Sequence, residues 1–181
     1  TGTELSNITA GTVNIGDSST GNITVDGISA ANSNNATTVN LTTASGSSVS
    51  FSNNASIFQA LAVSSGNGIN QGVNVTTSST ATLDADSNND GSGDFSNTAG
   101  TFSTGGSALS ITGNDFSLSG SINTGTGTTT ILVSDGGSIG LGSTVGNMTI
   151  TGTELGNITA GTLTIGDSTA GAMTVNGISL A

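Results

Sequence analysis

The chain has 181 residues, of which 11 are acidic and none is Lys, Arg, His or Cys, so its net charge is −11. Because no side chain is cationic, none can neutralise phosphate, which excludes recognition of DNA or RNA by a basic surface and membrane binding by a basic patch. Without His or Cys, the chain also lacks the usual catalytic base, the thiol nucleophile and the zinc ligands. We therefore expect no enzymatic activity and no catalytic residues.

Apolar residues recur along the chain as pairs separated by one small or polar residue, which is the alternation typical of β-strands. In chain order the pairs are Val13/Ile15, Ile23/Val25, Val39/Leu41, Val49/Phe51, Leu61/Val63, Val73/Val75, Leu109/Ile111, Phe116/Leu118, Ile131/Val133, Ile139/Leu141, Met148/Ile150, Leu163/Ile165 and Met173/Val175. Segments rich in Gly, Asn, Asp and Ser separate them and supply turns without proline. The pattern predicts an all-β fold of short strands, with no helix of useful length.

A duplication distinguishes between the all-β architectures. Residues 1–31 return as residues 151–181, with 22 of 31 positions unchanged. Closed barrels and sandwiches do not extend by tandem repetition, whereas a β-solenoid does. We therefore expect a β-solenoid in which residues 1–150 are one full period and residues 151–181 begin the next, as in a window from a longer array.

In a solenoid each turn of chain contributes two or three short strands, which stack in parallel on their counterparts at about 4.8 Å. Inward Val, Ile, Leu and Phe side chains then form ladders in a narrow core, and we expect all five phenylalanines to point inward. Two strand-and-turn units suggest a coil of about 20 residues, which gives roughly seven coils in each period. Thr, Ser and Asn suit the exposed strand positions.

The chain resembles the repeat regions of filamentous-haemagglutinin-like giant adhesins, which are large secreted surface proteins of Gram-negative bacteria. The resemblance covers essentially the whole chain and is carried by segments such as TELGNITAGTLTIGDSTAGAMTVNGIS (153–179), LDADSNNDGSGDF (83–95), ALSITGNDFSLSGSINTGTGTTTILVSDGGSIGLG (108–142) and SVSFSNNASIFQALAV (48–63). It implies a right-handed parallel β-helix, export from the cell, and a role as the extended shaft of an adhesin or surface fibre. It identifies no receptor, because the family's binding regions are not matched.

One acidic segment interrupts the uniform pattern. The residues Asp84, Asp86, Asn88, Asp90 and Asp94 are candidate calcium ligands. Asp86, Asn88 and Asp90 followed by Gly91 match the opening of a calcium loop, in which alternating oxygen ligands converge and glycine permits the bend. Position twelve of that pattern is Asn97 instead of the bidentate Glu, so the segment is not an EF-hand. The two readings left open are a weaker Ca²⁺ site and an acidic, solvated turn between strands at Leu83 and Phe95.

Two non-catalytic roles remain, and both place the protein outside the cell, at the bacterial surface. In the first, the solenoid is a shaft that gives length and rigidity and presents a distal binding region. In the second, it is a self-associating filament or sheath, with Ca²⁺ bridging the acidic faces of like fibres. Eleven uncompensated negative charges make neighbouring rods repel each other, which favours the shaft. The expected partners are neighbouring repeats of the same chain; we expect neither a required cofactor nor insertion into a membrane.

Overall fold

The computed structural model describes residues 1–179, which are almost entirely β-structure in parallel sheets with few, short helices. Sheet A contains seven strands: β1 (Ala10–Ile15), β3 (Ala36–Ser45), β6 (Ala60–Gly66), β9 (Ala81–Asp84), β12 (Leu109–Gly113), β15 (Thr128–Val133) and β19 (Thr162–Ile165). Sheet B contains β2 (Ile23–Val25), β4 (Val49–Phe51), β7 (Ile69–Gln71), β10 (Phe95–Asn97) and β13 (Phe116–Leu118). Sheet C contains β5 (Ser56–Phe58), β8 (Val75–Thr77), β11 (Thr101–Ser103), β14 (Ser121–Asn123) and β18 (Ile158–Thr159).

A smaller sheet D and four short helical segments complete the described chain. Sheet D contains β16 (Ile139–Gly142), β17 (Met148–Ile150) and β20 (Met173–Asn176). The helices are α1 (Gly2–Leu5), α2 (Ala30–Ser33) and α3 (Gly152–Gly156), with one 3₁₀ turn at Ser134–Gly136. Both α1 and α3 begin with a capping box, in which a threonine and the glutamate three residues later bond each other's backbone N–H.

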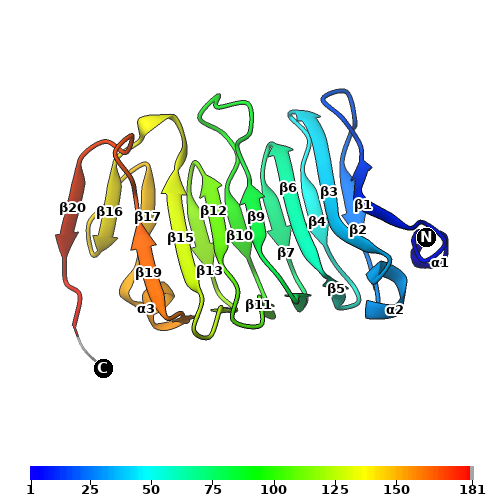
Figure 1. Cartoon of the computed structure of the whole chain (residues 1–181). Coiled ribbons are helices and arrows are strands. Elements are labelled where there is room, and N and C mark those ends of the chain that lie inside the picture. The colour runs from blue at the N-terminus through cyan, green and yellow to red at the C-terminus, as the bar shows by residue number, and fades with distance from the viewer. Residues whose placement is uncertain (180–181) are drawn as a thin grey trace.

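The chain passes through the three large sheets in a fixed order. From β3 to β15 it visits sheet A, then sheet B, then sheet C, and returns to sheet A, four times in succession. Every neighbouring pair of strands is parallel. As a result the chain advances in one direction, from the N-terminus at one end of the molecule to β20 near the other (Figure 1). The expected all-β class and parallel stacking are confirmed.

The core is built from rows of side chains that run across the strands. In sheet A, one such row takes a single apolar residue from every strand: Ile15, Leu41, Val63, Leu83, Ile111, Ile131 and Ile165. The five inner members of this row are at most 3% exposed, and the two end members are more exposed. The residue that precedes each member of this row lies on the opposite face and is Asn, Ala, Thr or Ser, so apolar residues alternate with small or polar ones there.

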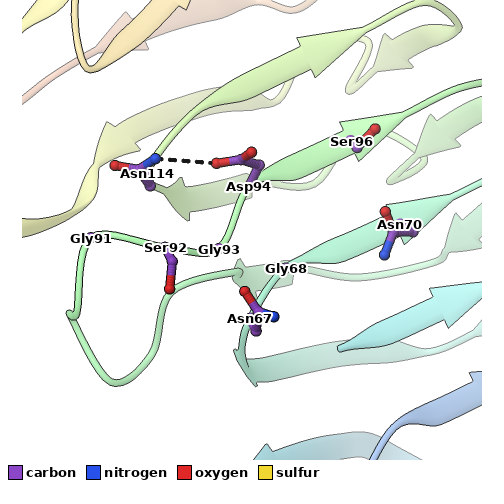
Figure 2. A pocket seen from close by; sticks show the side chains of 9 residues that line it. All are labelled: Asn67, Gly68, Asn70, Gly91, Ser92, Gly93, Asp94, Ser96 and Asn114. Carbon is purple, nitrogen blue, oxygen red and sulfur yellow. Dashed lines mark hydrogen bonds between the residues drawn. The ribbon is translucent and has the colours of Figure 1, made fainter. Parts of the chain in front are cut away.

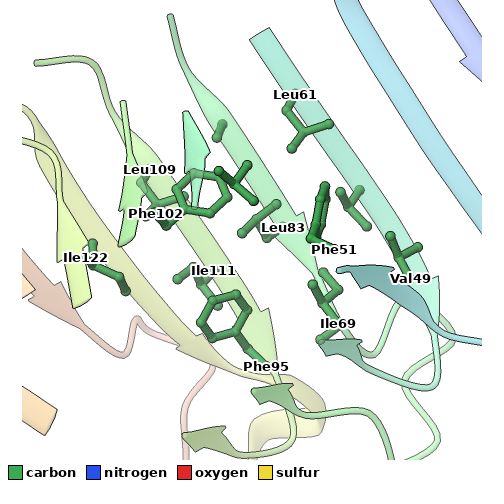
Figure 3. Close-up of a cluster of buried hydrophobic side chains, with 14 of the residues drawn as sticks. Val49, Phe51, Leu61, Ile69, Leu83, Phe95, Phe102, Leu109, Ile111 and Ile122 are labelled. Atoms are coloured by element: carbon green, nitrogen blue, oxygen red, sulfur yellow. The ribbon is translucent and has the colours of Figure 1, made fainter. Parts of the chain in front are cut away.

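Side chains from sheets A, B and C meet in one continuous hydrophobic cluster (Figure 3). Phe51, Phe95 and Phe116 lie in sheet B, while Phe58 and Phe102 lie in sheet C, and all five are at most 3% exposed. The expectation that every phenylalanine points inward is therefore confirmed. Burying aromatic rings contributes the largest apolar area per residue, so these five anchor the core.

The number of residues per turn matches the expected value of about 20 in some turns and exceeds it in others. Leu61 pairs with Ala81, 20 residues later, whereas Thr128 pairs with Thr162, 34 residues later. Between β15 and β19 the chain also forms β16 and β17 of sheet D, α3 and β18, so this turn contains additional elements. Part of this addition joins the core, since Ile139, Met148 and Ile150 are buried members of the hydrophobic cluster.

Candidate functional site

The acidic segment forms the connection between β9 in sheet A and β10 in sheet B. We call residues 84–94 the acidic loop. The corresponding corner contains only residues 67–68 between β6 and β7, and only residues 114–115 between β12 and β13, whereas residues 85–94 lie between β9 and β10. The acidic loop is therefore an insertion at one corner, and it extends beyond the neighbouring corners (Figure 1).

Asp86 lies at the base of the acidic loop and is fully buried. Its Oδ1 accepts a 3.2 Å hydrogen bond from the backbone N–H of Asp90, and its Oδ2 accepts a 2.6 Å bond from the Ser134 hydroxyl. Ser134 follows β15, so this contact joins the acidic loop to a segment 48 residues later in the chain. Both carboxylate oxygens are thus engaged in holding the loop against the body of the molecule.

The tip of the acidic loop is held by Asn88 and Asp90. Asn88 Nδ2 donates to Asp90 Oδ2 at 2.6 Å and to the Ser45 hydroxyl at 3.0 Å. Asp90 Oδ1 accepts bonds from the backbone N–H and the hydroxyl of Ser92. The Ser92 hydroxyl, followed by the Asn88 amide, lowers the pKa of Asp90, because both bonds favour its ionised form.

Asp84 and Asp94 lie at the two ends of the acidic loop and have different environments. Asp84 is half-buried, and its Oδ1 accepts the backbone N–H of Asp86 at 3.2 Å. Burial raises the pKa of Asp84. The hydrogen bond from the Asp86 N–H opposes this shift, and the negative charge of Asp86 adds a smaller increase. Asp94 Oδ1 accepts bonds from the backbone N–H of Asp115 at 3.0 Å and from the Asn114 amide at 3.3 Å, across to the next corner (Figure 2).

Three backbone positions in the acidic loop have positive φ: Asn89 at 49°, Gly91 at 77° and Gly93 at 127°. The requirement for glycine is strictest at Gly93, where a Cβ atom would lie 2.2 Å from the carbonyl oxygen of Ala85. Glycine therefore permits both the left-handed conformation and the close approach of two backbone segments.

The five candidate calcium ligands lie in one loop but form separate hydrogen-bonded groups. Asp86, Asn88 and Asp90 are linked through the tip, whereas Asp94 turns toward Asn114 at the next corner. Within residues 1–179, no three acidic side chains converge in a way that could hold a metal ion. Asn97, at position twelve of the motif, is buried in β10, where its Oδ1 accepts the Gly120 N–H. Calcium binding stays a prediction.

A polar cleft of 460 Å³ lies beside the acidic loop (Figure 2). Its lining is Asn67, Gly68, Asn70, Gly91, Ser92, Gly93, Asp94, Ser96 and Asn114. Sequence reasoning did not identify Asn67, Asn70 or Asn114 as neighbours of the acidic loop, because Asn67 and Asn70 belong to the preceding turn of the chain and Asn114 to the following one. The feature that could have indicated these three residues is their common position beside or within a strand of sheet B. No aromatic or cationic side chain is part of this lining.

No family model, curated protein or solved structure in our comparisons matches the chain. In the described part of the chain, no helix is long and apolar enough to span a membrane.

Proposed function

We propose that the chain is a right-handed parallel β-solenoid and that it serves as the non-catalytic shaft of a large bacterial adhesin or surface fibre, outside the cell. The observation that carries the proposal is sheet A, whose seven parallel strands each contribute one apolar residue to a single core row. At about 4.8 Å per strand, the six steps of this sheet extend about 29 Å. An architecture of this kind gains length with each coil.

The handedness follows from a general rule. A strand that returns to the same sheet in parallel does so by a right-handed crossover in almost all proteins, because twisted strands pack back onto the sheet only that way. Each passage from sheet A through sheets B and C and back is such a crossover. We therefore assign the solenoid the right-handed form.

The composition supports a shaft whose surface has little attraction for its copies. The chain carries 11 acidic residues and no cationic side chain, so like rods repel each other. Ile57 is an exposed apolar residue along the sheets, and the duplicated ends contribute most of the others. With few apolar groups along the sides, lateral hydrophobic association has little area to use.

Electron micrographs of the native fibre, recorded in chelator and in millimolar calcium, separate the shaft from a self-associating sheath. A shaft gives single rods under both conditions. Lateral bundles that form in calcium and dissolve in chelator would favour the sheath, in which Ca²⁺ bridges acidic loops of neighbouring fibres. Bundles that need no calcium would contradict the argument from charge repulsion.

A further inference from the structure

The two copies of the duplicated sequence fold alike at opposite ends of the molecule (Figure 1). Helix α1 corresponds to α3, strand β1 to β19 and strand β2 to β20, each shifted by the 150-residue period. We call residues 1–29 the first copy and residues 151–179 the second copy. Because the duplicated segments are identical at 22 of 31 positions, differences in their surroundings indicate what this fold packs against on each side.

Each copy is covered on one side only, and the two sides are opposite. The first copy is followed by later strands, with β1 paired to β3 and β2 paired to β4. The second copy is preceded by earlier strands, with β19 paired to β15, β18 to β14 and β20 to β16. Taken together, the copies show both neighbours of one and the same coil.

The exposure of apolar side chains differs between the two copies, because each copy is covered on a different side. Among the described residues, eight large apolar side chains are exposed, and six of them lie in the two copies: Ile8, Ile15, Leu163, Met173, Val175 and Ile178. The counterpart of each in the other copy is less exposed. Val175 is 58% exposed, whereas its counterpart Val25, which pairs with Phe51 in β4, is 7% exposed. Ile8 is 42% exposed, whereas Ile158 pairs with Ile122 in β14 and is partly buried.

Polar contacts show the same relationship. Glu154 Oε1 accepts the backbone N–H of Leu118 at 3.0 Å, and Asn157 Nδ2 donates to the Leu118 carbonyl at 3.3 Å. These two side chains bind the main chain at the end of β13. Their counterparts in the first copy are the identical residues Glu4 and Asn7, both exposed. The first copy therefore carries the same pair of groups without the strand that they bind.

We infer that the two copies are the two sides of one joint, at which a further 150-residue period of the same polypeptide stacks head to tail. Its counterparts of Val39 and Phe51 cover Leu163 and Val175 in the register that β3 and β4 show on the first copy. On the other side, Glu4 and Asn7 bind the main chain of a Leu118 counterpart. This inference rests on the proposed function, because it specifies how one period of the shaft continues into the next.

The test uses a two-period protein, in which residues 1–150 are followed directly by residues 1–181. It contains the sequence of the first copy twice, once at its start and once at the joint. The variant Glu4→Ala is made at the joint and, as a matched control, at the start. Both variants lose the same capping box. The start variant also loses the exposed ion pair of Glu4 with the N-terminal ammonium, whereas only the joint variant loses the contact with Leu118. Asn7→Ala is made at both positions as a second, independent pair.

Amide hydrogen exchange of the joint segment is the measurement. We expect the joint variants to speed its exchange roughly tenfold or more, because each removes a hydrogen bond to the Leu118 main chain. The same substitutions at the start leave the joint unchanged. Equal effects at both positions would overturn the inference, even if the protein remains a single rod and the shaft proposal stands.

Small-angle X-ray scattering provides a measurement that does not depend on these variants. Stacked periods give one rigid rod whose length grows by one period. Two rods joined by a flexible link would contradict the joint. Separate one-period chains could instead assemble into rods of unlimited length, with no further stability when two periods are covalently linked. That result would assign the two surfaces to contact with a second chain and would overturn the inference as stated.

Discussion

Phe95 and Phe116 stack with ring centroids 5.6 Å apart and an interplanar angle of 19°. They occupy the same position in β10 and β13, paired in register in sheet B. The ring contact therefore links two neighbouring strands of sheet B in addition to their backbone pairing. Both residues belong to the buried cluster, and each is at most 1% exposed.

Truncation of this stack tests its contribution to stability. We expect Phe95→Ala to lower the free energy of unfolding by about 3–5 kcal/mol, since it removes a buried ring and leaves a cavity. Ile57→Ala, which truncates a side chain that is 39% exposed in sheet C, is the control and should cost less than about 1 kcal/mol. Chemical denaturation measures both. Equal losses would contradict the burial assigned to sheet B.

The backbone of the acidic loop is tested at Gly93. Alanine there combines a positive φ with a Cβ 2.2 Å from a carbonyl oxygen, so we expect Gly93→Ala to destabilise by roughly 2 kcal/mol or more. Gly11→Ala is the matched control, because a Cβ at Gly11 meets no atom within 4 Å. Thermal unfolding compares the two variants. A neutral Gly93→Ala would mean that the loop adopts another conformation.

The raised pKa of Asp84 makes the stability of the fold depend on pH. Burial raises the pKa of Asp84 above its ordinary value of 3.8, so the folded chain binds this proton more tightly than the unfolded chain. Ionised Asp84 therefore destabilises the fold, and this penalty grows as the pH rises from 3.8 through the folded pKa. We expect Asp84→Asn to stabilise the protein at pH 7, by less than about 1 kcal/mol after allowance for solvent screening.

The control for Asp84 is Asp26, whose pKa is shifted the other way. The amides of Asn53 and Asn54 donate to its carboxylate and lower the pKa of Asp26 below 3.8. This group stabilises the fold at neutral pH, and the stabilisation is lost as the pH falls through the folded pKa. Asp26→Asn should therefore destabilise at pH 7. Denaturation of both variants between pH 3 and 7 checks the two signs, and the same sign for both would contradict the assignments.

Calcium is tested directly on the acidic loop. Both carboxylate oxygens of Asp86 already accept hydrogen bonds, from the Asp90 N–H and the Ser134 hydroxyl. If the loop is an acidic, solvated turn, the melting temperature is the same in chelator and in millimolar calcium. A rise in calcium that Asp90→Asn abolishes would instead establish the metal site, because binding to the folded state stabilises it by mass action. Asp167→Asn, outside the loop, is the control.

Much of the fold could be predicted from the apolar pairs, but several three-residue strands could not. In β11 and β14 only the central residue is buried, Phe102 and Ile122 respectively, so no alternation is visible in the sequence. In β7 and β10 the second inward position holds Gln71 or Asn97, buried polar residues that break the pattern. The position of these strands depends on pairing with neighbouring strands of the same sheet. A local sequence pattern carries no information on that pairing.

The acidic loop shows a second limit. The sequence indicated that Asp86 belongs to a surface loop, but the carboxylate is buried because Ser134 approaches it from 48 residues away. The insertion of residues 85–94 at one corner likewise made the coil length uneven. A contact between residues so far apart in the sequence depends on which corners lie next to each other in the folded chain. The local spacing of residues does not specify this.

The most direct test of the central claim is the axial layer spacing of the native fibre, measured by cryo-electron microscopy. A parallel β-solenoid predicts layers about 4.8 Å apart along the rod axis. The seven strands of sheet A then correspond to seven consecutive layers. A rod without this layering, or one whose 4.8 Å spacing runs across its axis, would contradict the solenoid and with it the proposed shaft.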